Sequence, residues 1–205
     1  MLPLNVTLSY YKRRDVQEEI IKAAENREVA VRFGDKFGNR PDVLNNPNDI
    51  LELAKQKATS FHCSEELWSN ALQLNSNMKK HDLGELRIGW DLVLDIDCSF
   101  YEYSKIAADL IIKALKFNDI KSISCKFSGN KGFHIGIPFE AFPETVNGEK
   151  TKKLFPDAAK RIAFYIKELI KKPLGEKIMQ FEDNNFSKVI EKTKENPNKI
   201  TYHEK

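Results

Sequence analysis

The chain has 205 residues, enough for one large domain or two small ones, and 41% of them are apolar and can supply a core. Lysine and arginine exceed the acids by only three, so the overall charge does not single out a nucleic-acid-binding protein. Charge is unevenly distributed, because residues 150–205 carry 14 basic and 8 acidic side chains. Such a region can contact phosphates, although a solvated, lysine-rich helix face has the same composition.

The cysteines and the apolar runs exclude several protein classes. Cys63, Cys98 and Cys125 are scattered, odd in number and lack a C-x-x-C spacing, which argues against a disulfide framework and a zinc site. The N-terminus lacks the apolar run of a signal peptide, and no stretch approaches the roughly 20 apolar residues of a membrane span. We therefore expect a cytoplasmic protein without a membrane partner.

The first half of the chain predicts a helix, a strand and a second helix. Apolar residues recur near helical spacing over 15–25, with Asp15 as a possible N-cap. Residues 28–33 favour a strand, and a second helix is expected from Asn48 or Asp49 through Ala54. Residues 59–63 look extended, whereas residues 70–80 are mostly polar and predict a loop.

The second half contains a strand, a helix and a hairpin within fifty residues. An apolar strand over 90–97 ends on acids, and an amphipathic helix follows over about 104–117. Two strands at 122–127 and 133–137 flank a glycine-containing turn. A last strong helix begins near Asp157 and is expected to stop before Pro173.

The sequence Asp95-Ile-Asp97 lies at the end of the apolar strand. Side chains two residues apart on a strand point to the same face, so the two carboxylates converge. Two close negative charges favour a bound cation, and oxygen ligands suit Mg²⁺ or Mn²⁺. D-x-D also occurs often by chance, and two solvated acids at a strand end remain the alternative.

The turn between the two later strands reads Ser128-Gly-Asn-Lys-Gly-Phe-His134. Gly129 and Gly132 let the backbone approach an anion closely, and the Ser128 hydroxyl, free N–H groups and Lys131 can donate to phosphate oxygens. His134 can also donate to a triphosphate, although a lone histidine on an apolar strand is more often a packed core residue.

Together, metal-binding acids and a phosphate-binding turn form the two halves of a nucleotidyl-transfer site. The order strand, D-I-D, helix, strand, S-G-x-x-G-x-H resembles the catalytic small subunit of archaeal and eukaryotic primases and the related primase-polymerases. The resemblance is strong over residues 85–140. Upstream, Arg27-Glu-Val-Ala-Val31 is similar to the family's R-E-F-x-F strand, Arg40 falls where the family has a basic residue, and Ser60-Phe-His62 resembles its S-H element.

The resemblance implies an α/β (α+β) fold with an RNA-recognition-motif-like sheet unit and flanking helices. It predicts a catalytic domain over residues 1–175, with an N-terminal α/β part at 1–80 and a motif-bearing part at 85–172 whose sheet is antiparallel or mixed. Residues 176–205 are then a basic, loosely ordered C-terminal segment.

The resemblance also assigns roles. Asp95 and Asp97 are implied to be the catalytic, metal-binding carboxylates. Nucleotide contacts are implied for Ser128, Gly129, Lys131, Gly132, His134, Arg40 and His62. For Arg27 and Glu28 an exposed strand pair is an equal alternative to a place in the cleft.

The implied activity is that of a DNA primase or primase-polymerase that serves DNA replication. With Mg²⁺ or Mn²⁺, a 3'-hydroxyl attacks the α-phosphate of an NTP or dNTP on a template and pyrophosphate leaves. Implied partners are nucleoside triphosphates and single-stranded DNA or primer-template, with a primase large subunit or another replication or repair protein as further candidates.

One family feature has no clear match, namely a third carboxylate some tens of residues after the S-G-x-x-G-x-H strand. Glu182 and Asp183 lie at a tolerable distance, and Asp183 is the better candidate. Without this acid, the chain is a truncated primase core or a non-catalytic nucleotide- or nucleic-acid-binding subunit. A metal-dependent nuclease also uses clustered acids, but it gives no reason for the serine-glycine turn.

Overall fold

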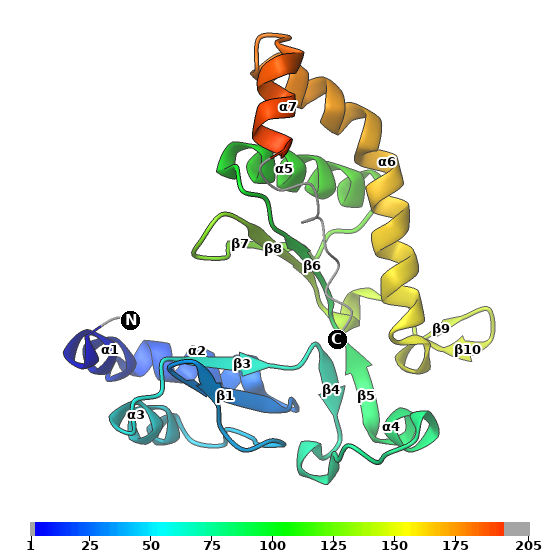
Figure 1. Ribbon diagram of the computed structural model, residues 1–205. Helices are drawn as coiled ribbons and strands as arrows, with labels where there is room; N and C mark the ends of the chain where they lie inside the picture. Colours follow the sequence, from blue (N-terminus) through cyan, green and yellow to red (C-terminus); the bar gives the residue numbers. More distant parts are fainter. Residues whose placement is uncertain (1–2, 195–205) are drawn as a thin grey trace. The chain divides into compact units, whose positions relative to one another are not determined.

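The computed structural model describes residues 3–194, and this part of the chain forms two compact units (Figure 1). The first ends at Trp90 and the second begins at Asp91. Both contain helices and small sheets, and every strand pairing is antiparallel, so the expected α+β class is confirmed. No helix within residues 3–194 is both long enough and apolar enough to span a membrane.

The first unit has one three-stranded sheet in the order β2-β1-β3 and one two-stranded sheet, β4-β5. Its helices are α1 (Leu4–Tyr11), α2 (Arg14–Ala24), α3 (Pro47–Lys55) and α4 (Lys80–Leu86), with a 3-10 turn η1 at Ala71–Gln73. Its strands are β1 (Val29–Phe33), β2 (Lys36–Phe37), β3 (Ser60–Cys63), β4 (Glu66–Trp68) and β5 (Arg87–Trp90).

The core of the first unit lies between β1 and the first three helices. Val29 and Val31 alternate along β1 and are almost fully buried, in one cluster with Tyr11 of α1 and Ile50 of α3. The start of α3 is set by a capping box, in which Asn46 and Asp49 satisfy each other's backbone N–H groups. Because side chains alternate along a strand, Ala30 and Arg32 of β1 point to the face opposite this core.

The second unit is built on a three-stranded sheet in the order β6-β8-β7. Its strands are β6 (Leu92–Ile96), β7 (Ser124–Phe127), β8 (Phe133–Ile137) and the small hairpin β9 (Thr145–Val146) and β10 (Glu149–Lys150). Its helices are α5 (Tyr101–Phe117), α6 (Asp157–Phe181) and α7 (Phe186–Lys194), with short 3-10 turns η2 (Phe139–Ala141) and η3 (Thr151–Leu154).

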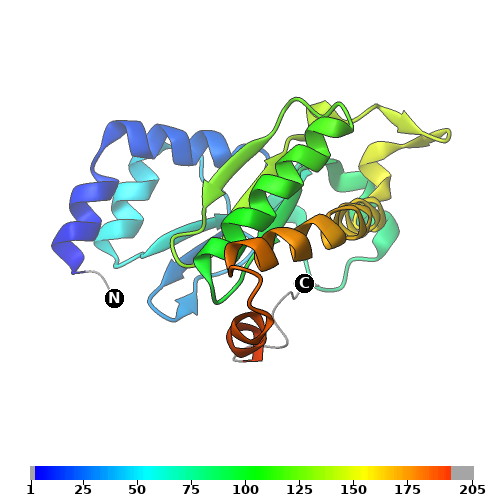
Figure 2. The same cartoon turned by 90° about the horizontal axis from the view of Figure 1, so that it is seen from above.

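One face of this sheet packs on helix α5. Leu92 pairs with Ile137 and Leu94 with Ile135, and all four side chains are buried. Helix α6 packs in turn against α5, as both views show (Figures 1 and 2). Because side chains alternate along a strand, Asp95 and its cross-strand partner are directed to the other face, which we call the open face.

Most predicted elements are confirmed to within a few residues, including the helix at 15–25, the strand at 28–33 and the hairpin before residue 137. The elements that were not predicted are α1, α4, α7, β2, β4, β5, β9 and β10. Helix α1 is missed because its apolar residues do not form a buried stripe, since Leu4, Val6 and Tyr10 are all exposed.

The predicted continuous strand over 90–97 is wrong, because Asp91 interrupts it and separates two strands. Trp90 ends β5 and Leu92 begins β6. Asp91 leaves the strand geometry and its Oδ1 accepts a hydrogen bond from the Phe139 N–H at 3.0 Å. The acids of the motif still lie at the end of an apolar strand, but that strand is shorter than predicted.

The predicted helix end before Pro173 is also wrong, since α6 continues through Pro173 to Phe181. Proline removes only one hydrogen bond of the helix, and side chains on both sides of it, such as Ile170 and Ile178, are buried or half-buried. Packing therefore outweighs the local preference. Residues 176–194 are mostly helical instead of loosely ordered, and residues 195–205 lie outside the described part of the chain.

Candidate functional site

The two acids of the D-I-D sequence lie at the end of β6 next to the open face. Asp95 is the penultimate residue of the strand, and Asp97 follows the last one, Ile96. Both side chains are exposed, whereas Leu92 and Leu94 on the alternate positions are buried. The alternation expected for the two carboxylates is therefore present, with oxygen atoms accessible to solvent and to a ligand.

His134 of β8 is the cross-strand partner of Asp95, and it belongs to the same face. Its Nε2 lies 3.4 Å from Asp95 Oδ1, and about one third of its side chain is exposed. The imidazole is thus a surface group beside a carboxylate, which differs from the packed core histidine that was the alternative. When protonated, it forms an ion pair with Asp95.

Lys126 extends this row to the third strand. It is the cross-strand partner of His134 on β7 and is exposed. A carboxylate, an imidazole and an ammonium group thus lie side by side across β6, β8 and β7. Lys126 was not among the predicted site residues, because only the register of β7 on β8 places it beside His134.

The turn between β7 and β8 is closed by its own hydrogen bonds. The Ser128 N–H donates to the Gly132 carbonyl at 3.0 Å, and the Gly132 N–H donates to Ser128 Oγ at 3.2 Å. Gly129 has φ +90°, a conformation that favours glycine. The Ser128 hydroxyl keeps its own proton for a ligand, and within the described residues the N–H groups of residues 129–131 make no hydrogen bond.

The turn touches the D-I-D strand at Gly132. A Cβ added to Gly132 would lie 2.0 Å from the carbonyl oxygen of Ile96 and 3.4 Å from the Asp97 Cα. Only a glycine allows this approach. On the helix-covered side, the rings of Phe127 and Phe133 meet at 5.8 Å between centroids and Tyr101 of α5 contacts both. The two motifs are therefore held together by backbone contact and by an aromatic support.

Among the residues that the structure describes, no third metal-binding acid is found next to this pair. Within residues 3–194, no group of three or more His, Cys, Asp and Glu side chains is placed to hold a metal ion. Asp183 directly follows Glu182, which is buried and accepts a hydrogen bond from the Tyr103 hydroxyl at 3.0 Å. Tyr103 belongs to α5, which covers the opposite face of the sheet, so the chain turns there away from the open face.

Two exposed carboxylates nevertheless suit a hard divalent cation. Mg²⁺ and Mn²⁺ are commonly bound by one or two protein carboxylates, with substrate phosphates and water as the other ligands. The donor set of Asp95 and Asp97 fits this pattern for one cation. A second cation that shares the same oxygens needs a further negative ligand.

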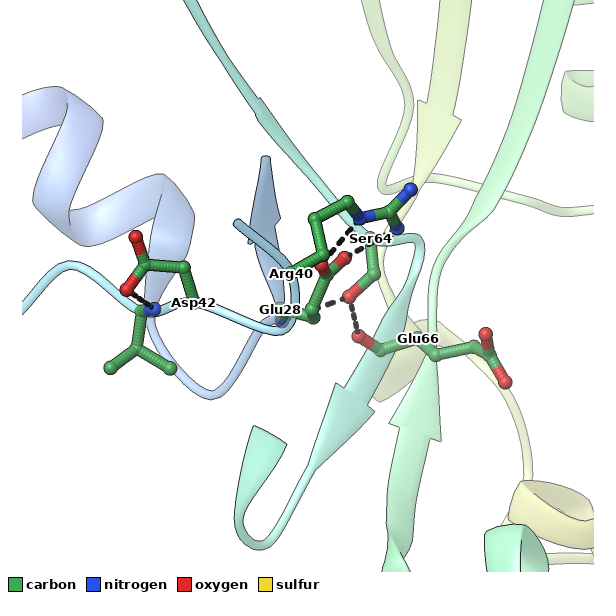
Figure 3. Close-up of polar contacts among 6 residues, drawn as sticks. Glu28, Arg40, Asp42, Ser64 and Glu66 are labelled. Atoms are coloured by element: carbon green, nitrogen blue, oxygen red, sulfur yellow. Dashed lines mark hydrogen bonds and ion pairs between the residues drawn. The ribbon is translucent and has the colours of Figure 1, made fainter. Parts of the chain in front are cut away.

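Arg40 and His62, the remaining predicted site residues, belong to the first unit. Arg40 donates from Nε and Nη2 to the two carboxylate oxygens of Glu28, at 2.7 and 2.8 Å (Figure 3). These hydrogen bonds to the Glu28 carboxylate raise the pKa of Arg40. Glu28 is only 5% exposed, so the alternative of an exposed Arg27–Glu28 strand pair does not hold for Glu28, which is buried with its ion pair.

The neighbours of this pair complete the local structure. The Ser64 hydroxyl accepts from the Glu28 N–H at 3.2 Å and donates to the Glu66 carbonyl at 2.7 Å (Figure 3). Arg27 donates to the carbonyls of Ser64 and Glu65. His62 is exposed, and its Nε2 lies 2.9 Å from Ser60 Oγ. Arg27 and Glu28 thus join β1 to the segment after β3.

Comparison with known proteins adds no relative, because no protein-family model and no curated protein matches the chain. Functional inference therefore rests on the motifs and on the geometry of the open face.

Proposed function

We propose that this chain is a template-dependent nucleotidyltransferase of the DNA primase or primase-polymerase class. The observation that carries the proposal is the contact between the D-I-D strand and the Ser128–Gly132 turn, with His134 beside Asp95. Cation-binding oxygens and phosphate-binding donors are the two requirements of nucleotidyl transfer, and here they adjoin on one sheet face.

The residues of the open face divide the work. The Ser128 hydroxyl, the free N–H groups of the turn, Lys131 and His134 donate to the triphosphate and orient its α-phosphate. Asp95 and Asp97 would hold Mg²⁺ or Mn²⁺, which would neutralise charge at the phosphates and lower the pKa of the 3'-hydroxyl. Substrates are NTPs or dNTPs on single-stranded DNA or primer-template, in a replication or repair setting that includes a primase large subunit as a candidate partner.

The strand order supports the RNA-recognition-motif-like part of the proposal. The succession β6, α5, β7, β8, α6 matches the first five elements of a β-α-β-β-α-β unit. Such a unit has a fourth strand after its second helix, and within residues 3–194 the outer edge of β6 has no paired strand. Asp95 belongs to this edge strand, so an acid on a strand added there would lie near it.

A second candidate function is a truncated core or a non-catalytic nucleotide-binding subunit. The absence of a third acid among the described residues favours it. Two carboxylates and a phosphate-binding turn suffice to bind one metal–nucleotide complex. Turnover then requires an acid from another chain or from outside the described residues.

An incorporation assay with template, primer, labelled nucleotide and Mn²⁺ tests both candidates, with nucleotide binding measured in parallel by calorimetry. Polymer growth supports the transferase, and binding without growth supports the subunit. Shortening of the labelled strand would indicate a nuclease and contradict both.

Asp95→Asn is the diagnostic variant. We expect it to abolish growth and cation-dependent nucleotide binding while the melting temperature holds or rises, because Asp95 is half exposed and adjoins another acid. His134→Ala is expected to weaken nucleotide binding without affecting template binding. Near wild-type turnover in Asp95→Asn would refute the catalytic assignment.

A further inference from the structure

The first unit has its own exposed sheet face, opposite helices α1–α3. In the register of this sheet, Arg32 pairs with Phe37 on β2 and with Ser60 on β3, and Ala30 pairs with His62. Directly paired residues of antiparallel strands share a face. The side chains of Arg32, Phe37, Ser60 and His62 therefore lie together, and we call this set the stacking face.

An aromatic ring of this face, on the edge strand β2, is open to solvent. Phe37 is 51% exposed. A single exposed phenylalanine is ordinary, but this one lies beside an imidazole and a guanidinium group. The His62 ring meets it edge-on, at 5.3 Å between centroids and an interplanar angle of 79°, and the Arg32 guanidinium carbon lies 6.0 Å from the ring centroid. These two contacts hold the Phe37 ring in place, and the half of the side chain that is exposed remains accessible to a ligand.

Two arginines of the first unit, Arg32 and Arg40, have guanidinium groups that are partly exposed. Arg40 binds the buried Glu28 through Nε and Nη2, and its side chain is 60% exposed compared with 7% for Glu28. The pair thus shows its cationic end to solvent. Arg32 donates from Nε to the Gly34 carbonyl, and its Nη2 lies 3.9 Å from Asp35, an exposed carboxylate in the adjacent turn.

We propose that the stacking face binds single-stranded nucleic acid, with a base on the Phe37 ring and the adjacent phosphate near Arg40 or Arg32. Base stacking on an exposed aromatic ring next to arginine is the usual chemistry of single-strand binding, and it tolerates any base. Bases within a duplex are already stacked, so they cannot reach the ring. The choice of nucleic acid as the partner rests on the proposed function, whereas the contacts involve the first unit alone.

The test compares two oligomers that differ only in their bases. A short fluorescein-labelled oligo(dT) and an abasic oligomer of the same length and charge are titrated with the full chain, and anisotropy gives the Kd. In Phe37→Leu, which keeps an apolar side chain but removes the ring, we expect about tenfold weaker binding of oligo(dT). Binding of the abasic oligomer is expected to stay at its wild-type value.

Two matched variants control for the ring and for nonspecific loss. Phe37→Tyr keeps an aromatic face and is expected to bind oligo(dT) like the wild type. Phe117→Leu removes a ring that is 80% exposed in the second unit, and it is also expected to bind normally. Thermal melts of all three variants confirm that each remains folded.

The outcomes separate this inference from the proposed function. Unchanged oligo(dT) binding in folded Phe37→Leu, or equal weakening of both oligomers, would overturn the stacking face. The first result would also favour a protein segment as the partner of Phe37. Asp95→Asn is expected to bind oligo(dT) normally. Oligo(dT) binding therefore tests the stacking face whether or not the chain has nucleotidyltransferase activity.

Discussion

At the scale of single residues, Gly132 is the position where the two motifs depend on each other. Its Cα approaches the Ile96 carbonyl so closely that a methyl group would collide with backbone, which cannot rotate away as a side chain can. Asp95 and His134, in contrast, are surface groups whose replacement leaves the packing of the sheet intact. The site is therefore held in place by a backbone contact, while its chemistry lies in exposed side chains.

Gly132→Ala is expected to weaken nucleotide binding and to destabilise the second unit by about 1–3 kcal/mol, because the turn must move away from the D-I-D strand. Nucleotide titrations and thermal melts measure the two effects. Gly84→Ala is the matched control, since a Cβ at Gly84 meets nothing within 4 Å. Gly132→Ala with the binding and stability of the wild type would contradict the close approach.

At the scale of elements, α6 shows how packing extends a helix beyond its local sequence preference. Pro173 and Gly175 both disfavour a helix interior, yet the helix continues for two further turns to Phe181. Behind it, the buried Glu182 joins three elements, because it accepts hydrogen bonds from Tyr103 of α5 and from Lys192 of α7.

Gly175→Ala tests the continuation of α6. Gly175 is exposed, and a Cβ there meets nothing within 4 Å, so alanine is expected to stabilise the protein by roughly 0.5–1 kcal/mol. Thermal melts measure this gain. Gly148→Ala serves for comparison, because Gly148 has φ +82° and alanine there is expected to destabilise. If the chain were not helical at Gly175, the alanine variant would not melt at a higher temperature than the wild type.

The junction of Glu182 predicts a dependence of stability on pH. The hydrogen bond from Lys192, followed by that from Tyr103, holds the pKa of Glu182 below its ordinary value of 4.5. A carboxyl whose pKa is lowered by folding stabilises the folded state above its unfolded pKa, and this contribution is lost as pH falls through the folded pKa. Burial and the bond to Glu182 raise the pKa of Tyr103 to about 12, so its phenol remains a donor throughout this range.

Glu182→Gln is therefore expected to melt several degrees below the wild type at pH 7. The difference in melting temperature should shrink as pH falls below about 4.5, because the wild-type carboxyl then becomes protonated and, like glutamine, uncharged. Melts of both proteins from neutral to acidic pH measure it. A difference that stays constant with pH would show that the carboxylate charge does not stabilise the junction.

At the scale of the whole molecule, basic residues are concentrated in the last part of the chain. The excess of basic residues lies after residue 150, and the exposed face of α6 contains Lys171 and Lys172. Their acidic neighbours Glu168 and Glu176 are 3.5 and 4.0 Å away, in pairs open to solvent that contribute little. These lysines are available to a polyanion.

Reversal of both charges, Lys171→Glu with Lys172→Glu, is expected to flatten the dependence of log K on log salt for single-stranded DNA by about 1.4, at about 0.7 for each phosphate contact. Lys12→Glu with Lys57→Glu changes the net charge equally on the first unit, where both lysines are exposed, and is expected to leave the slope unchanged. An equal effect in the two pairs would mean that the α6 lysines act only through net charge.

The sequence by itself determined the local elements and the two motifs. Periodicity located the helix before Phe117 and the hairpin around Ser128–Gly132, because these elements depend on neighbours within a few residues. Alternation in β6 likewise placed Asp95 and Asp97 on exposed positions. Family resemblance supplied the chemistry expected of these residues.

Only the tertiary structure decided which groups meet across the chain. The burial of Glu28 by Arg40, the break at Asp91 and the passage of α6 through Pro173 all come from partners that are remote in sequence or from packed neighbours. The contact of Gly132 with Ile96 joins two motifs that are some thirty-five residues apart. Glu182 forms its hydrogen bond with Tyr103 of α5, so the neighbouring Asp183 does not approach Asp95 and Asp97. The spacing of residues along the chain does not predict these contacts, because they depend on packing and on the pairing of buried polar groups.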